Sequence, residues 1–255
     1  MVGSLLLRGM LVGVLAGFFA FGFARIFGEP QVDLAIALEG TLAHSHDHGD
    51  ATAQAGAEAE EPELVSRETQ AGLGLFTGAV VYGAAIGGLY ALVFAFVYGR
   101  VGRLDARATA ALLALAAFIA VVVVPDLKYP ANPPAVGNPD TIGERTTLFF
   151  IMLAISIAAM VLAVRLARGL VLVHGGWDAA LASGAVYIAI IAVAMIALPV
   201  VNEVPEHFPA DLLWKFRIAS LGMHAVLWTT IGVAFGALTE RSFARRAGGR
   251  IALSR

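Results

Sequence analysis

Residues 146–164, TTLFFIMLAISIAAMVLAV, form an uninterrupted apolar run between Arg145 and Arg165. The run holds 19 residues without Asp, Glu, Lys or Arg, and a membrane-spanning helix needs about 17–25 predominantly apolar residues. Five further runs of this kind predict an all-α, polytopic membrane protein: a bundle of about six transmembrane helices with Pro-rich outer loops. The predicted helices cover residues 5–27, 72–98, 108–125, 146–165, 179–200 and 213–238 of a single integral membrane domain, 1–255.

The composition of the chain agrees with this interpretation. Hydrophobic residues make up 59% and charged residues 14% of the 255 residues, whereas soluble domains have about 45–50% and about 25%. The net charge of −2 gives no basis for a nucleic-acid partner. The absence of Cys excludes disulfides, iron–sulfur clusters and thiolate metal sites. Because no nucleotide-binding or hydrolase motif appears either, we do not expect an enzyme.

The distribution of basic residues predicts the orientation of the helices. With the N-terminus in the cytoplasm, 11 of the 17 Lys and Arg residues fall on the cytoplasmic side, as the positive-inside rule requires. We therefore expect a protein of the bacterial inner membrane with both termini in the cytoplasm. The first run also fits a signal peptide cleaved after Gly22-Phe23-Ala24, which would leave five helices; its length favours a retained helix.

The first predicted outer loop, residues 28–70, is rich in His and acidic residues. It contains the run HSHDHGD, residues 44–50. In an extended chain every second side chain lies on the same face, so three imidazoles would point to one side. Imidazoles and carboxylates suit Co²⁺, Ni²⁺, Cu²⁺ or Zn²⁺, and we predict a flexible metal-collecting segment; the alternative is a solvated acidic linker. The predicted ligands are His44, His46, Asp47, His48 and Asp50.

The two Pro-rich loops that follow predict an outer mouth. Their polar residues, together with Arg217 at the start of the sixth predicted helix, are candidates for contact with the cargo or for anchoring at the membrane surface. Lys215 and Arg217 would repel a cation, so we expect Glu203, Glu206 or Asp211 to pair with them and the remaining groups to bind metal. The predicted metal ligands here are Glu203 and His207, and the other mouth residues are Lys128, Arg145, Asn202, Glu206 and Arg217.

His224 lies inside the sixth predicted helix, seven residues after Arg217. An ionisable residue at that depth predicts a functional site, and the alternative is a neutral imidazole that bonds a backbone carbonyl. Seven residues are nearly two helical turns, so both side chains should share one helix face. We expect His224 to be a metal ligand below the outer mouth.

Several stretches resemble the probable cobalt transporter subunit family, CbtA. They are FARIFGEP at residues 23–30, YPANPPAVG at 129–137, which is the most specific, and the NEVP and FP motifs within 202–209. The resemblance covers essentially the whole chain. It implies an integral membrane protein for cobalt uptake linked to cobalamin synthesis, acting with CbtB, a small one-helix subunit with a His-rich end. The family is usually described with five helices, whereas six are counted here.

The sequence therefore predicts a permease component for a divalent transition metal, above all cobalt. We expect no tightly bound cofactor, with Co²⁺, Ni²⁺ or Zn²⁺ as the transported ion. Membrane lipid, CbtB and further copies of the chain are the expected partners. Two alternatives stay open: a transporter of an anionic or corrinoid-like solute, favoured by basic residues on the outer side, and a non-transporting membrane scaffold or sensor that binds metal.

Overall fold

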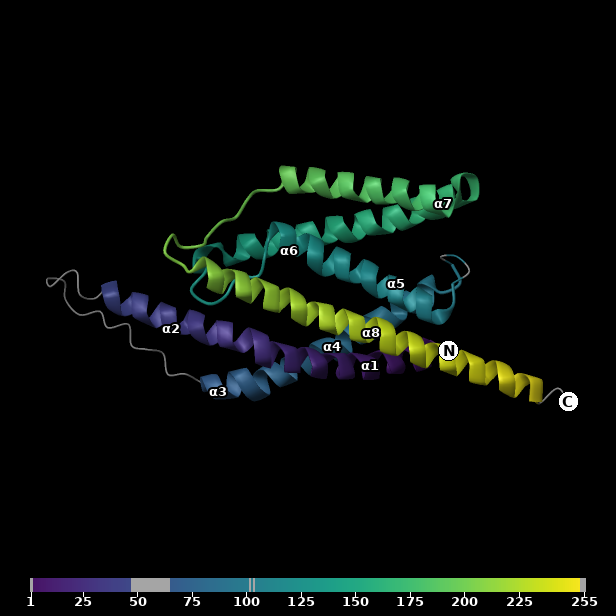
Figure 1. Ribbon diagram of the computed structural model, residues 1–255, viewed down its shortest axis with the longest axis horizontal. Coiled ribbons are helices and arrows are strands. Elements are labelled where there is room, and N and C mark those ends of the chain that lie inside the picture. Colours follow the sequence, from purple (N-terminus) through teal and green to yellow (C-terminus); the bar gives the residue numbers. More distant parts are fainter. Residues whose placement is uncertain (1, 47–64, 101, 103, 253–255) are drawn as a thin grey trace.

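The computed structural model describes residues 2–46, 65–100, 102 and 104–252, and this part of the chain contains helices but no strand (Figure 1). Three helices continue through a π-helical turn, denoted η1, η2 or η3, and a short 3₁₀ turn, η4, precedes α7. The elements are α1 (Val2–Phe23), η1 (Ala24–Gly28), α2 (Glu29–His46), α3 (Arg67–Thr69), η2 (Gln70–Gly74), α4 (Leu75–Val97), α5 (Ala106–Phe118), η3 (Ile119–Val123), α6 (Val124–Lys128), η4 (Pro139–Thr141), α7 (Ile142–Ala197) and α8 (Ala210–Ala252).

Five helical segments are long and apolar enough to cross a membrane: Val2–Gly40, Arg67–Val97, Ala106–Lys128, Pro139–Ala197 and Ala210–Arg245. The fourth has 59 residues, far more than one span needs. Its helix is interrupted at Gly175, where φ is 81° and ψ is 170°, and α7 folds back there into two antiparallel arms (Figure 1). Counted by arms, the described bundle has six spans, which confirms the prediction of about six helices.

The two ends of the bundle differ in what they carry (Figure 1). Both termini of the chain lie towards one end, together with the Gly175 turn of α7; we call this the terminal end. The connections 129–141 and 198–209 lie at the opposite end, which we call the loop end. Termini at the same end are what an even number of spans requires.

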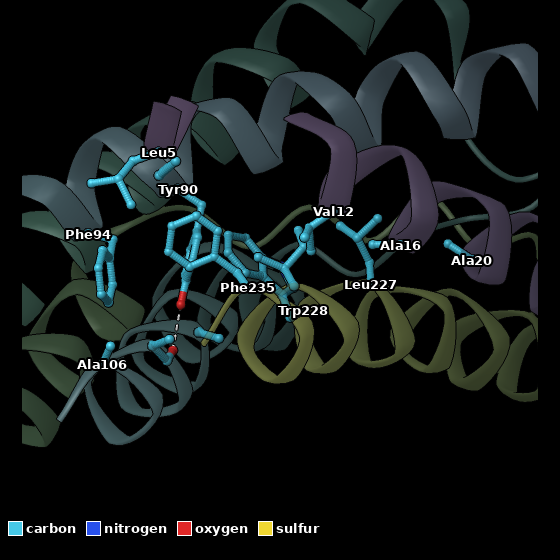
Figure 2. Packing of buried hydrophobic residues seen from close by; sticks show 14 of the residues in the cluster. Leu5, Val12, Ala16, Ala20, Tyr90, Phe94, Ala106, Leu227, Trp228 and Phe235 are labelled. Atoms are coloured by element: carbon cyan, nitrogen blue, oxygen red, sulfur yellow. Dashed lines mark hydrogen bonds between the residues drawn. The ribbon is translucent and has the colours of Figure 1, made fainter. Parts of the chain in front are cut away.

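Helices α1, α4, α5 and α8 form the central packing unit. Glycines of α1 and α4 face one another so closely that a Cβ on Gly13 would overlap the carbonyl oxygen of Gly83, which is how small residues let membrane helices pack. Beside this seam, Tyr90 contacts Trp228 and Phe235 through ring edges (Figure 2). The Tyr90 hydroxyl donates to the Ala110 carbonyl at 2.5 Å, which satisfies a polar group where lipid offers no partner.

The two arms of α7 join this unit through the end of the third span. Met152 and Ala159 of the first arm and Ile191 of the second pack with Val124 of α6. The Ser156 and Tyr187 hydroxyls, 3.0 Å apart, link the arms. The Lys128 ammonium donates to the Met195 carbonyl at 2.8 Å, which ties α6 to the second arm at the loop end.

The predicted loop 28–70 requires a correction. The first helix does not end near residue 27 but continues through η1 into α2, as far as His46. Arg67 holds this extension, because its guanidinium pairs with Glu29 and, at 2.9 Å, with Asp33. Ala35 of α2 is fully buried and packs with Phe208 and other residues near the loop end. Residues 47–64 of the predicted loop lie outside the described residues.

Candidate functional site

The loop end of the bundle contains a cavity of about 370 Å³. We call it the loop-end cavity. The segment after α6 forms one wall, the segment after α7 another, and the first turns of α7 and α8 complete it. Its lining residues are Tyr129, Pro130, Asn132, Val136, Ile142, Arg145, Thr146, Phe149, Val201, Asn202, Glu203, Val204 and Arg217.

Arg217 enters this cavity from the second turn of α8. Its Nε donates to the Ala131 carbonyl at 3.2 Å, and its Nη2 donates to Asn132 Oδ1 at 2.9 Å. Within the described ranges no carboxylate forms an ion pair with Arg217, so the expected carboxylate partner of this residue is wrong. The expected pairing of Lys215 is confirmed, with Asp211 at 2.7 Å. Among the described residues, the side chain of Arg217 thus donates to one backbone carbonyl and one side-chain amide oxygen.

Glu203 joins the two loops that border the cavity. Its Oε1 accepts from the Thr141 hydroxyl at 2.5 Å, its Oε2 accepts from the Asn138 N–H at 2.7 Å, and Arg145 Nε lies 3.3 Å from Oε2. The hydrogen bonds from Thr141 and Asn138, with the charge of Arg145, lower the pKa of Glu203. Both carboxylate oxygens are thus engaged in holding the loops together, and the role of Glu203 as a metal ligand stays a prediction.

Gly137 shapes the other side of Arg145. Its φ is +120°, a conformation that L side chains rarely adopt, and a Cβ there would lie 2.5 Å from Arg145 Nη1. Only glycine lets the loop backbone approach the guanidinium this closely. Arg145 Nη2 also donates to the Asn138 carbonyl at 3.2 Å. The YPANPPAVG stretch is therefore the wall that positions both arginines of the cavity.

His224 lies two turns further along α8. Its Nδ1 is 2.9 Å from the carbonyl oxygen of Ser220, and because a carbonyl can only accept, Nδ1 carries the hydrogen. His224 thus bonds a backbone carbonyl of its own helix, as the alternative prediction proposed for a neutral imidazole. This bond leaves Nε2 with a lone pair that can accept a proton or bind a metal. Asp126 of α6 lies close enough to His224 to interact with it electrostatically.

Asp126 is a candidate that the sequence analysis missed. It directly follows the third predicted helix, residues 108–125, and was not among the predicted site residues. The available signal was its place directly after Pro125 in VVVVPDLK, because a carboxylate so close to an apolar run needs a partner or a function. In the structure it lies close enough to His224 of the sixth span to interact with it electrostatically.

The remaining predicted residues do not gather into one site. Asn202 lines the cavity, whereas Glu206 and His207 are exposed on the 198–209 connection and are not lining residues. A second cavity of about 380 Å³, lined by His224 and apolar residues, shares no lining residue with the first. The predicted route from mouth to His224 is therefore not one continuous cavity. Among the described residues no group of three or more His, Asp or Glu is placed to hold a metal ion.

The HSHDHGD segment is only partly described. His44 and His46 are the end of α2, so their backbone is helical and not extended as the prediction assumed. Asp47, His48 and Asp50 lie outside the described residues, and metal binding by the segment stays a prediction.

These features define a polytopic helical membrane protein with a polar, arginine-bearing cavity at one end and a histidine, His224, within the sixth span. A family model described as "Probable cobalt transporter subunit (CbtA)" matches residues 2–240. The chain belongs to the CbtA family. The two stretches that carry the resemblance most clearly, 129–137 and 202–209, both border the loop-end cavity. No curated protein and no solved structure matches the chain.

Proposed function

We propose that this chain is the membrane-spanning component through which cobalt crosses the bacterial inner membrane into the cytoplasm, where it serves cobalamin synthesis. The observation that carries the proposal is His224 in the sixth span, whose Nδ1 is bonded to the Ser220 carbonyl and whose Nε2 is left for a ligand. Asp126 lies near enough to interact with it electrostatically, and the family is described as probable cobalt transporter subunits. Intramembrane ionisable residues are costly and mark ion pathways. No catalytic step is part of the proposal.

The chemistry of the pair suits a transported ion. Imidazole nitrogen and carboxylate oxygen are both ligands for divalent cobalt. Two protein ligands leave most coordination positions to water or to other donors, so binding is weak enough for release. A transport site needs this compromise, because the ion must enter and then leave.

The orientation of the bundle gives each end a role. The basic residues in the last turns of α8 and between the inner ends of the helices support a cytoplasmic terminal end, and we propose that the loop end faces outwards. The HSHDHGD segment would collect the metal near this end. The description of the family as a subunit supports a partner, for which we propose the one-helix protein CbtB.

Uptake of radioactive cobalt into proteoliposomes, with and without CbtB, tests the proposal. We expect Asp126→Asn and His224→Ala each to lower the uptake rate at low cobalt concentration by about 10-fold or more, the usual effect of disturbing a metal site. His174→Ala and Asp178→Asn are matched controls, because these residues are exposed near the Gly175 turn of α7. Normal uptake by both Asp126→Asn and His224→Ala would contradict the proposal.

A transporter of an anionic or corrinoid-like solute is the second candidate function. The two arginines of the loop-end cavity favour it. Under this candidate, uptake of cobalt salts would be negligible with every variant. A non-transporting sensor, in turn, predicts cobalt binding to the purified protein without flux in the same vesicles.

A further inference from the structure

We propose that the loop-end cavity binds the carboxylate groups of an anionic metal complex, so that cobalt reaches the protein as a chelate with a small polycarboxylate. This inference rests on the proposed function and names the chemical form of its cargo. It follows from the charge of the cavity, from the hydrogen-bonding groups that line it, and from its size.

The charge of the cavity favours an anion. Its charged lining residues, within the described part of the chain, are Arg145, Glu203 and Arg217. Glu203 and Arg145 form an ion pair, which leaves the charge of Arg217 without a carboxylate partner. A partly buried cation lowers the energy of a nearby anion and repels a bare divalent metal ion. The cavity therefore has the wrong sign for hydrated Co²⁺.

The lining groups also present donors. A guanidinium has five N–H groups and no lone pair, so it cannot ligate a metal but binds a carboxylate through two parallel bonds. Arg217 uses Nε and Nη2 towards the 131–132 backbone and amide, and Nη1 remains for a ligand. Asn132 Oδ1 faces Arg217, so its amide N–H groups are also available. Both oxygens of Glu203 are already engaged.

The cavity has the size of a small-molecule site. Its volume of about 370 Å³ lies within the range of about 300–1,000 Å³ typical of such sites, and a single water takes about 30 Å³ of liquid volume. Val136, Phe149 and Val201 supply apolar walls for a carbon skeleton. His224 follows Arg217 by seven residues, about 10 Å along the helix, so a complex held here would sit near the Asp126–His224 pair.

Titration calorimetry of the full chain in nanodiscs tests the inference. The probes are citrate alone, CoCl₂ alone, and the preformed cobalt–citrate complex. We expect the complex to bind the wild type, and Arg217→Gln to weaken that binding by about 10- to 100-fold, as expected for hydrogen bonds to a charged group. The matched control is Lys215→Gln, which also removes one positive charge, only two residues before Arg217. The Lys215 side chain is exposed and pairs with Asp211, so this variant should bind the complex like the wild type.

A second variant separates binding from folding. Arg217 also holds the 131–132 segment, so Arg217→Lys is included; it keeps the charge but lacks the fork, and should bind the complex more weakly than the wild type. Binding of CoCl₂ that is as tight as that of the complex and insensitive to Arg217 would overturn the inference. So would citrate that binds equally well with and without cobalt, which would indicate a site for free carboxylates. The uptake measurement in proteoliposomes separates this inference from the proposed function. If cobalt uptake depends on His224 but is not increased by citrate, only the inference is overturned and the proposed function stands.

Discussion

At the scale of single residues, Glu203 carries a pH dependence that can be measured. The Thr141 hydroxyl and the Asn138 N–H, with Arg145 beside them, hold its pKa below the ordinary value of 4.5. When folding lowers the pKa of a carboxyl group, the ionised group stabilises the fold at every pH above its pKa in the unfolded chain. This stabilisation is lost as the pH falls through the lower pKa of the folded chain. We expect Glu203→Gln to melt at a lower temperature than the wild type at neutral pH. The melting temperatures of the two proteins, measured by thermal unfolding at a series of pH values, should converge as the pH drops below 4.5. A difference in melting temperature that does not change with pH would contradict this role.

The same scale shows how far the sequence predicts a site. His224 could be found because an imidazole within an apolar run stands out from its neighbours. The engagement of Glu203 could not, because its partners Asn138 and Thr141 are more than 60 residues away in sequence. The arginine-bearing cavity likewise depends on how two Pro-rich loops meet, which no local pattern specifies. Its residues were predicted one by one, but not which of them would lie together.

At the scale of elements, the contact between α1 and α4 depends on glycine. A Cβ at Gly13 would overlap the Gly83 carbonyl, which is part of the helix backbone and cannot rotate away. We expect Gly13→Ala to destabilise the bundle by about 1–3 kcal/mol, the usual cost of overpacking. Gly22→Ala in the same helix is the control, because its Cβ would meet nothing within 4 Å. Equal unfolding of the two variants in detergent would show that the helices can separate without cost.

The sequence predicts the helices that are defined by apolar runs. It does not predict the helix that depends on contacts with distant parts of the chain. Each of the five apolar helical segments among the described residues overlaps a charge-free run, and Pro139–Ala197 overlaps two of them. The continuation into α2 was not predicted, because the charged residues Glu29 and Asp33 are typical of a loop. In the structure Arg67, which is more than 30 residues later in the sequence, pairs with both of them. The buried Ala35 and its contact with Phe208 are equally invisible to local periodicity. A polar helix outside the bundle is thus specified by its partners and not by its own composition.

At the scale of the whole molecule, the described fold and the basic residues point to the same topology. The α7 turn at Gly175 lies at the terminal end and the 198–209 connection at the loop end (Figure 1). Because the terminal end carries most of the basic residues, the positive-inside rule predicts that this end faces the cytoplasm. A single uninterrupted span over Pro139–Ala197 would instead put the two ends of α7 on opposite sides of the membrane.

Single cysteines distinguish these topologies, since the natural chain has none. We expect a membrane-impermeant thiol reagent to label cysteines at positions 46 and 200 in intact cells, because both belong to the loop end. Cysteines at positions 176 and 246 should react only after permeabilisation, because they belong to the terminal end. Val200 is 82% exposed, so failure to label there cannot be ascribed to burial within the chain. Labelling of position 176 from outside would contradict the two-armed α7, and labelling of position 246 from outside would reverse the orientation on which the direction of cobalt uptake depends.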